Sequence, residues 1–237
     1  MNRSRVKNWE LFDDGLHSLD ARRAGQLARI SRSRGITFTV HGPICDLNLA
    51  TLNPELRPQV LRRMERSLQL SALLRAQKWV LHPGTHGALS WISRGEDWTV
   101  NMDSMKKLTA LGRKLGVEVV IENISAGHAI LGGVKDFLRL YKEWPKAPGI
   151  TLDAGHSHVK HETKQYLRRL AARIRHVHVH DNMGDIDTHL AVGSGTVMWR
   201  RFLSSLMATG FAEDIVVESV KGPFSSYDRV REILGSL

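Results

Sequence analysis

The sequence is poor in cysteine, in acidic residues relative to basic ones, and in long apolar stretches. Its single cysteine, Cys45, excludes an intrachain disulfide and fits a reducing compartment. No apolar run approaches the roughly 18 residues that a membrane span needs. The basic start, Met1–Lys7, is not followed by the apolar segment of a secretory signal. We therefore expect a cytoplasmic protein with no membrane partner.

Acidic residues are outnumbered by basic ones, 24 against 34, which gives a formal net charge of +10. Such an excess raises the question of nucleic-acid binding. The basic clusters, however, all fall inside predicted helices and are Arg62-Arg63-Arg66, Lys106-Lys107, Arg113-Lys114, Arg168-Arg169 and Arg200-Arg201. We interpret them as solvated helix faces, because a functional role needs the charge near a binding site.

The chain also lacks a Pro/Ser-rich linker and any low-complexity tract, so we expect residues 1–237 to form one domain. Short β-branched segments alternate with longer segments of helical periodicity. The predicted strands are Val6–Phe12, Ile36–His41, Trp79–His82, Val117–Glu122, Gly149–Asp153, Arg175–His180 and Asp214–Val220. The predicted helices are Leu19–Arg34, Pro54–Ala76, Trp98–Leu115, Val134–Trp144, Glu162–Arg173, Thr196–Thr209 and Ser226–Leu237.

Strict alternation of strand and helix predicts parallel strands joined by helical crossovers. An open sheet of the dinucleotide-binding type would carry a glycine-rich turn after an early strand, and none is present. Gly193-Ser194-Gly195 follows a polar stretch instead. The chain is therefore expected to be an α/β protein of the TIM-type (β/α) barrel class. Because only seven strands are visible, we expect the first β/α unit of such a barrel to be lacking.

Potential metal ligands stand at the ends of most predicted strands. In a barrel these ends meet in one cup, where active sites form. The alternation His176-Val-His178-Val-His180 places three imidazoles on one face of a strand, and burying them is costly unless each ring finds a partner. Asp181-Asn182 could also simply begin a loop. The mixture of imidazoles and carboxylates favours zinc or manganese over magnesium or calcium.

At these residues the chain resembles the xylose isomerase-like barrel superfamily, and within it AP endonuclease family 2, whose members include endonuclease IV. The resemblance runs from about Val6 to the C-terminus. It rests on the motifs His41-Gly-Pro, Asn48-Leu-Ala, His82-Pro-Gly, Ile121-Glu-Asn, Leu152-Asp-Ala-Gly-His156, His178-Val-His-Asp-Asn182, Asp187-Thr-His189, Gly193-Ser-Gly195 and Val217-Glu218-Ser.

The resemblance implies up to three zinc ions, and the donor mixture leaves manganese as the alternative metal. His41 and His82 would hold the first ion, which Glu122 would bridge to the second. The second would also take Asp153, His178 and Glu218, and the third His156, Asp187 and His189. Glu122, Glu218 and His178 are the residues expected to carry the chemistry. Adjacent divalent ions can generate hydroxide and stabilise both oxygens of a phosphodiester displacement.

The substrate stays open between abasic DNA and a small sugar or sugar phosphate. The lead hypothesis is a metal-dependent phosphoester hydrolase. The acidic loop Asp13-Asp14-Gly15 and the plain tip at Ile44-Cys45 argue against lesion recognition in DNA. The alternative is a sugar isomerase or epimerase, which needs one metal at Glu122, Asp153, His178 and Glu218 and uses both glutamates in proton transfer. A binding barrel without chemistry is a third hypothesis.

A lacking first unit has a consequence for assembly. Either the first and last predicted strands pair directly, or a gap remains between Val6–Phe12 and Asp214–Val220. We expect the gap, because strand tilt and stagger are tied to strand number in a barrel. Open strand edges invite association, so the gap predicts a homo-oligomer formed through this seam.

Overall fold

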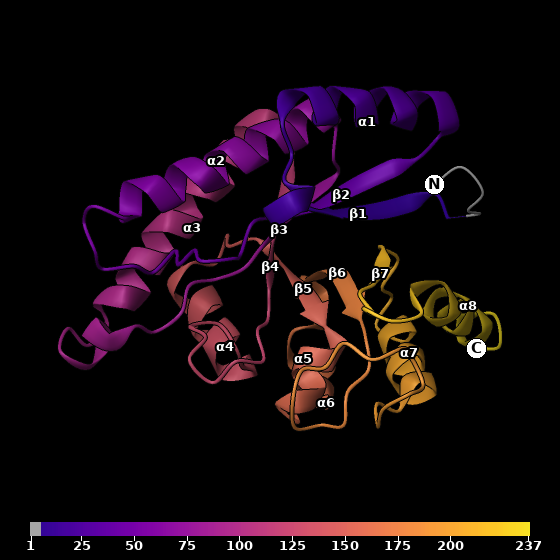
Figure 1. Cartoon of the computed structure of the whole chain (residues 1–237). Helices are drawn as coiled ribbons and strands as arrows, with labels where there is room; N and C mark the ends of the chain where they lie inside the picture. Colours follow the sequence, from indigo (N-terminus) through magenta and orange to yellow (C-terminus); the bar gives the residue numbers. More distant parts are fainter. Residues whose placement is uncertain (1–5) are drawn as a thin grey trace. The chain divides into compact units, whose positions relative to one another are not determined.

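The computed structural model describes residues 6–237, which form two compact units. The first runs to Ile121 and includes His128–Ile130, and the second comprises Glu122–Gly127 and Leu131–Leu237. Seven parallel strands, joined by helices, give the α/β TIM-barrel fold that the alternation predicted (Figure 1).

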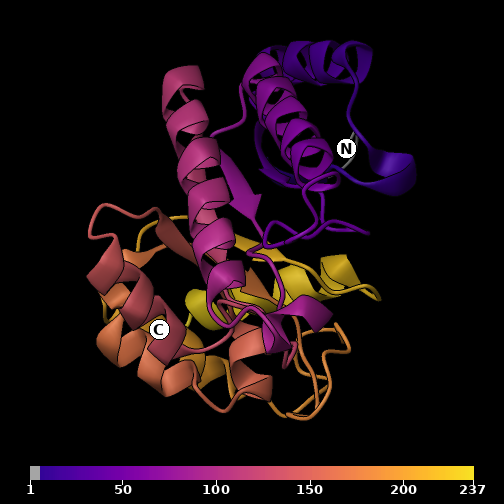
Figure 2. The same ribbon diagram turned by 90° about the vertical axis from the view of Figure 1, so that its left-hand side faces the viewer.

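The strands of the first unit follow one another in the sheet in chain order. They are β1 (Asn8–Phe12), β2 (Thr37–His41), β3 (Lys78–Leu81) and β4 (Glu118–Glu122), whose last residue opens the second unit. The register is parallel throughout, and Phe12 lies opposite His41 at the end of β1 and β2. Helices α1 (Ala21–Arg34), α2 (Arg57–Leu74) and α3 (Glu96–Leu115) connect the strands and lie side by side (Figures 1 and 2).

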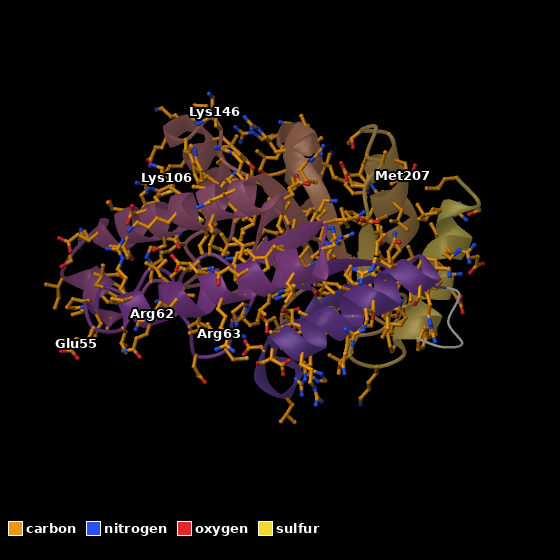
Figure 3. The ribbon with its side chains drawn as sticks, turned by 90° about the horizontal axis from the view of Figure 1, so that it is seen from above. Glu55, Arg62, Arg63, Lys106, Lys146 and Met207 are labelled. Atoms are coloured by element: carbon orange, nitrogen blue, oxygen red, sulfur yellow. The ribbon has the colours of Figure 1, made fainter. Side chains whose placement is uncertain are left out.

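The core of the first unit forms where α2 and α3 turn apolar side chains inward. Leu68 and Leu74 of α2, Trp79 of β3 and Leu108 of α3 are fully buried. The Trp79 indole donates its N–H to Ser67 Oγ at 3.0 Å, so the one polar atom of this large ring is satisfied. The opposite faces carry basic residues such as Arg62 and Lys106, which are exposed as expected of solvated helix faces (Figure 3).

The second unit carries β5 (Gly149–Asp153), β6 (Ile174–Val179) and β7 (Ile215–Val217), again parallel and in chain order. Its helices are α4 (Val134–Glu143), α5 (Ala154–Val159), α6 (Thr163–Arg169), α7 (Trp199–Met207) and α8 (Pro223–Leu234). The buried side chains of Leu152, Val177, Leu203 and Leu206 form its core. Valines alternate with histidines along β6 because successive side chains point to opposite faces of a strand.

Predicted elements are found within a few residues of their observed bounds, with three corrections. Asn53-Pro54 does not begin the helix, because Asn53 Oδ1 accepts the N–H groups of Glu55 and Leu56 and holds a turn before α2. The predicted helix Glu162–Arg173 is broken at Leu170, after which residues 171–173 form a short 3-10 turn. Helix α5 was not predicted, because six residues are too few to show a period.

Among the described helices, none is both long and apolar enough to cross a lipid bilayer.

Candidate metal centre

Four side chains of the second unit form the first cluster, and all lie at C-terminal strand ends. Glu122 ends β4, Asp153 ends β5, His178 lies near the end of β6, and Glu218 directly follows β7. Each offers a ligand atom within 4.8 Å of the others. His178 Nδ1 lies 3.2 Å from Glu122 Oε1 and 3.3 Å from Glu218 Oε1, so both glutamates face one ring nitrogen.

Strand register places these side chains together. Asp153 lies opposite His178 in the β5–β6 pair, and the Glu218 N–H donates to the Val179 carbonyl at 3.1 Å. Asn123 fixes the end of β4, because its side chain accepts the Asp153 N–H at 2.8 Å and donates to the Asp153 carbonyl at 3.2 Å. Glu122, Asp153 and His178 are fully buried, whereas Glu218 is partly open. Of these four side chains, Glu218 is therefore the one that solvent reaches.

A second cluster comprises His156, His180, Asp187 and His189, whose ligand atoms also lie within 4.8 Å of one another. His156 lies on α5, where Asp153 Oδ1 accepts its backbone N–H at 2.6 Å and caps the helix. Asp187 Oδ2 is 2.9 Å from His156 Nε2 and 3.4 Å from His189 Nε2. Three of these residues were predicted as ligands of one ion, and the structure brings them together.

The loop that carries Asp187 and His189 is held by Asp181. Its carboxylate accepts the backbone N–H of Gly193 at 2.8 Å and the indole N–H of Trp199 at 2.7 Å. The Asn182 side chain donates a hydrogen bond to the Gly155 carbonyl. Its side-chain oxygen accepts one from the Gly184 N–H. Asp181-Asn182 thus serve as loop organisers, which was one of the interpretations of the sequence.

Electrostatics in the second cluster are dominated by neighbouring opposite charges. Burial would lower the pKa of His156, but the carboxylates of Asp153, Asp187 and Glu122 raise it to about 10. Burial would also lower the pKa of His189, but the hydrogen bond and the charge of Asp187 outweigh burial and raise this pKa to about 9. Burial would raise the pKa of Asp187, yet the hydrogen bonds of His156 and His189 hold it well below its usual range. The cluster therefore favours positive charge among its imidazoles.

The two clusters fit divalent metal ions. Imidazole nitrogens and carboxylate oxygens are the donors that zinc and manganese take in proteins. Asp187 Oδ1 is buried and accepts no hydrogen bond from residues 6–237, so an ion there would satisfy it. The first cluster would hold an ion through three carboxylates and His178, and that ion would supply Lewis-acid chemistry beside the partly exposed Glu218.

His41 and His82 were predicted as a further pair of ligands and belong to the first unit. The pair follows the ends of β2 and β3, and the two ring centroids are 4.8 Å apart. His41 Nδ1 lies 2.9 Å from the Gly42 carbonyl. Within the first unit the structure therefore brings the two imidazoles together.

The acidic loop after β1 has a structural role. Asp13 is fully buried and is bound by the Arg63 guanidinium at 3.1 Å. The Asp14 carboxylate accepts hydrogen bonds from the backbone N–H groups of Ile44 and Cys45. Burial would raise the pKa of Asp14, but these bonds outweigh burial and lower it. The loop therefore anchors the chain after β2.

His180 is the cluster member that was not predicted as a ligand. Its side chain is fully buried, and its Nε2 lies 3.1 Å from the Asp153 carboxylate and 3.6 Å from Asp187 Oδ1. The alternation of histidine and valine placed it on the same face as His178, and that signal could have found it. Gly155 makes room for it, because a Cβ at this position would lie 2.1 Å from His180 Cε1.

Parallel strands joined by helices, with imidazoles and carboxylates at the strand ends, define a barrel-class protein with a candidate metal centre. The chain belongs to the xylose isomerase-like TIM barrel family, whose model matches residues 6–235. It is 28% identical over 239 residues to the uncharacterized protein MJ1614 of Methanocaldococcus jannaschii, across 97% of this chain and 89% of that protein.

Three solved structures share the fold. A D-tagatose 3-epimerase-like protein is 22% identical with a TM-score of 0.89, covering 99% of this chain and 90% of its own. L-ribulose 3-epimerase is 14% identical with a TM-score of 0.78, covering 97% and 83%. The protein TTHB071 of Thermus thermophilus, in crystals soaked with zinc chloride, is 20% identical with a TM-score of 0.76, covering 96% and 88%.

Proposed function

We propose that this protein is a metal-dependent isomerase or epimerase that acts on a small sugar or sugar phosphate. The reacting sugar binds at Glu122, Asp153, His178 and Glu218. One observation carries this proposal: both glutamates face the same nitrogen of His178, so a single ion position has a carboxylate on two sides. The epimerases among the structures of similar fold support it.

The chemistry requires two proton transfers. One glutamate removes the proton from the carbon beside the sugar carbonyl, and the electron pair of that C–H bond moves into the enediolate. The other glutamate, in its acid form, then returns a proton to the opposite face, which inverts the carbon. Glu122, Asp153, His178 and Glu218 would hold a divalent ion, manganese or zinc, which would supply stabilisation of the negative charge that develops on oxygen. Acid–base groups placed in this way contribute about 10²- to 10⁴-fold to the rate.

The proposal is tested by isotope exchange. Metal-loaded protein is incubated in D₂O with a panel of ketoses and ketose phosphates, and the products are followed by NMR. We expect an epimer that carries deuterium at the inverted carbon. An abasic duplex at low salt with zinc or manganese is run in parallel. Cleavage of that duplex, with no exchange in any sugar, would overturn the proposal.

Phosphoester hydrolysis is the second candidate, because His156, Asp187 and His189 gather as an additional donor set that a one-metal isomerase does not need. In that case adjacent ions would activate water for attack on a phosphodiester. The abasic-duplex arm of the same experiment decides between the two.

A further inference from the structure

The second cluster has no role in the proton transfers proposed above. Its members His156, His180, Asp187 and His189 all belong to the second unit. The resemblance to endonuclease IV implies three ligands here, and His180 is a fourth. His180 either binds the same ion as these residues or only positions Asp153.

Three imidazoles surround the Asp187 carboxylate. Its Oδ2 lies 2.9 Å from His156 Nε2 and 3.4 Å from His189 Nε2, while its Oδ1 lies 3.6 Å from His180 Nε2. Both carboxylate oxygens thus face ring nitrogens, and Oδ1 is the buried oxygen that accepts no hydrogen bond from the described residues. The ligand atoms of all four side chains lie within 4.8 Å of one another, a spacing that one small cation can bridge.

The chain is shaped to hold the His180 ring in this place. A Cβ at position 155 would lie 2.1 Å from Cε1 and 2.5 Å from Nδ1 of His180, so only glycine fits there. On its other side the ring stacks on His189, with centroids 3.7 Å apart and planes 14° from parallel. The ring therefore has little freedom to turn away from Asp187.

The ring nitrogen of His180 that faces Asp187 also faces Asp153. Nε2 lies 3.1 Å from the Asp153 carboxylate and 3.6 Å from Asp187 Oδ1, so a cation at this nitrogen has a carboxylate on two sides. Burying carboxylates is costly unless they are paired, and a cation in this place pairs both.

We propose that His180 is the fourth protein ligand of a second metal site, completed by His156, Asp187 and His189. Four protein ligands close the tetrahedral shell of zinc, as in structural sites, whereas catalytic sites keep one position open for water or substrate. The second ion would then stabilise the loop of residues 183–198 and would not activate water. The proposal is independent of the sugar reaction.

Metal stoichiometry tests the proposal. Metal-free protein is titrated with zinc, passed over a desalting column and analysed for zinc per chain. We expect His180→Asn to lose one tightly bound equivalent, with at least a roughly 100-fold weaker affinity for that ion. The matched control is His161→Asn, because His161 is exposed, lies outside the cluster and has a φ of +56° that asparagine tolerates. The control should bind as the unchanged protein does.

Cobalt(II) reports the coordination number directly, and diffraction from the unchanged protein does not depend on the variant folding well. Cobalt in a four-coordinate site gives intense visible absorption, and this should weaken in His180→Asn. Anomalous scattering from zinc-loaded crystals of the unchanged protein should place an ion bonded to His180. An ion bonded only to His156, Asp187 and His189, or an unchanged stoichiometry and cobalt spectrum in His180→Asn, would show that His180 only positions Asp153. Neither readout involves a sugar, so the two proposals fail separately.

Discussion

Glu122 illustrates how a single buried carboxylate can serve chemistry. It is fully buried at the end of β4, with Oε1 3.2 Å from His178 Nδ1 and 3.6 Å from His156 Nδ1. A buried charge is stable only with such partners or a metal. Because Glu122 faces His178 of the first cluster and His156 of the second, a change in its charge acts on both clusters.

Replacing this charge should cripple the enzyme while the fold survives. Glu122→Gln keeps the shape of the side chain but can neither accept the substrate proton nor neutralise a cation. We expect turnover in the deuterium-exchange assay to fall about 10²- to 10⁴-fold, with an unchanged circular dichroism spectrum. Glu118→Gln, at the exposed start of the same strand, should retain activity. Full activity of Glu122→Gln with normal metal content would refute the assignment.

Gly155 should prove as sensitive as the ligands that it adjoins. Gly155→Ala pushes a methyl group into the His180 ring, and overpacking of this kind costs about 1–3 kcal/mol of unfolding free energy. Urea denaturation and zinc stoichiometry should both report the change. Gly127→Ala is the control, because nothing lies within 4 Å of a Cβ there. Equal stability of the two variants would mean that the ring moves aside freely.

At the residue scale, strand periodicity predicted which side chains lie together. Glu122, Asp153, His178 and Glu218 gather because parallel strands deliver their C-terminal ends to one place. His180 was not predicted as a member of the second cluster, although the same alternation placed it on the face of His178. Its role depends on the space that Gly155 leaves for its ring, and such a distance cannot be read from sequence.

At the scale of elements, two helix ends were predicted correctly and one helix start was not. The helices predicted to end at Arg34 and Leu115 do end there, because Gly35 and Gly116 are left-handed caps with φ of +60° and +72°. The start of α2 was misplaced because Asn53 caps a turn instead of the helix. Capping chemistry was thus recognised correctly, but the structure that the cap completes depends on the following backbone.

The cap at Gly116 makes a testable contribution to α3. Gly116→Ala forces a Cβ into the left-handed region, which costs roughly 1–2 kcal/mol, offset in part by the lower entropy of the unfolded alanine chain. We expect a net loss of about 1 kcal/mol in urea unfolding. Gly87→Ala, with φ of −100° and open space around it, should change stability much less. Similar losses in both variants would count against the cap.

Metal removal should lower the free energy of unfolding of the whole molecule, since ligands that bind only the folded state stabilise it. Zinc at about 100 times its dissociation constant adds about 2.7 kcal/mol per site. For a chain of this length that corresponds to a rise in melting temperature of about 5–10 °C. Calorimetry of chelator-treated and zinc-loaded protein measures it. Identical melting temperatures would exclude tight metal sites in the folded protein.

Assembly is a further prediction at the scale of the molecule. The seam expected between the first and last strands stays a prediction, and it implies a homo-oligomer because unpaired strand edges associate. Light scattering during size-exclusion chromatography should give a mass above that of one chain. A monomer at micromolar concentration would contradict it.

The order of the ligands along the chain has a consequence for biosynthesis. Glu122, Asp153, His178 and Glu218 come from four successive strand ends, and the last of them precedes only α8. A nascent chain therefore holds no complete set until β7 has left the ribosome. At the proposed metal site, acquisition of the ion would follow translation through that strand, and a product truncated before Glu218 would be left with three of the four proposed ligands. In a cell with little free metal, such unfinished chains would be the first to stay empty.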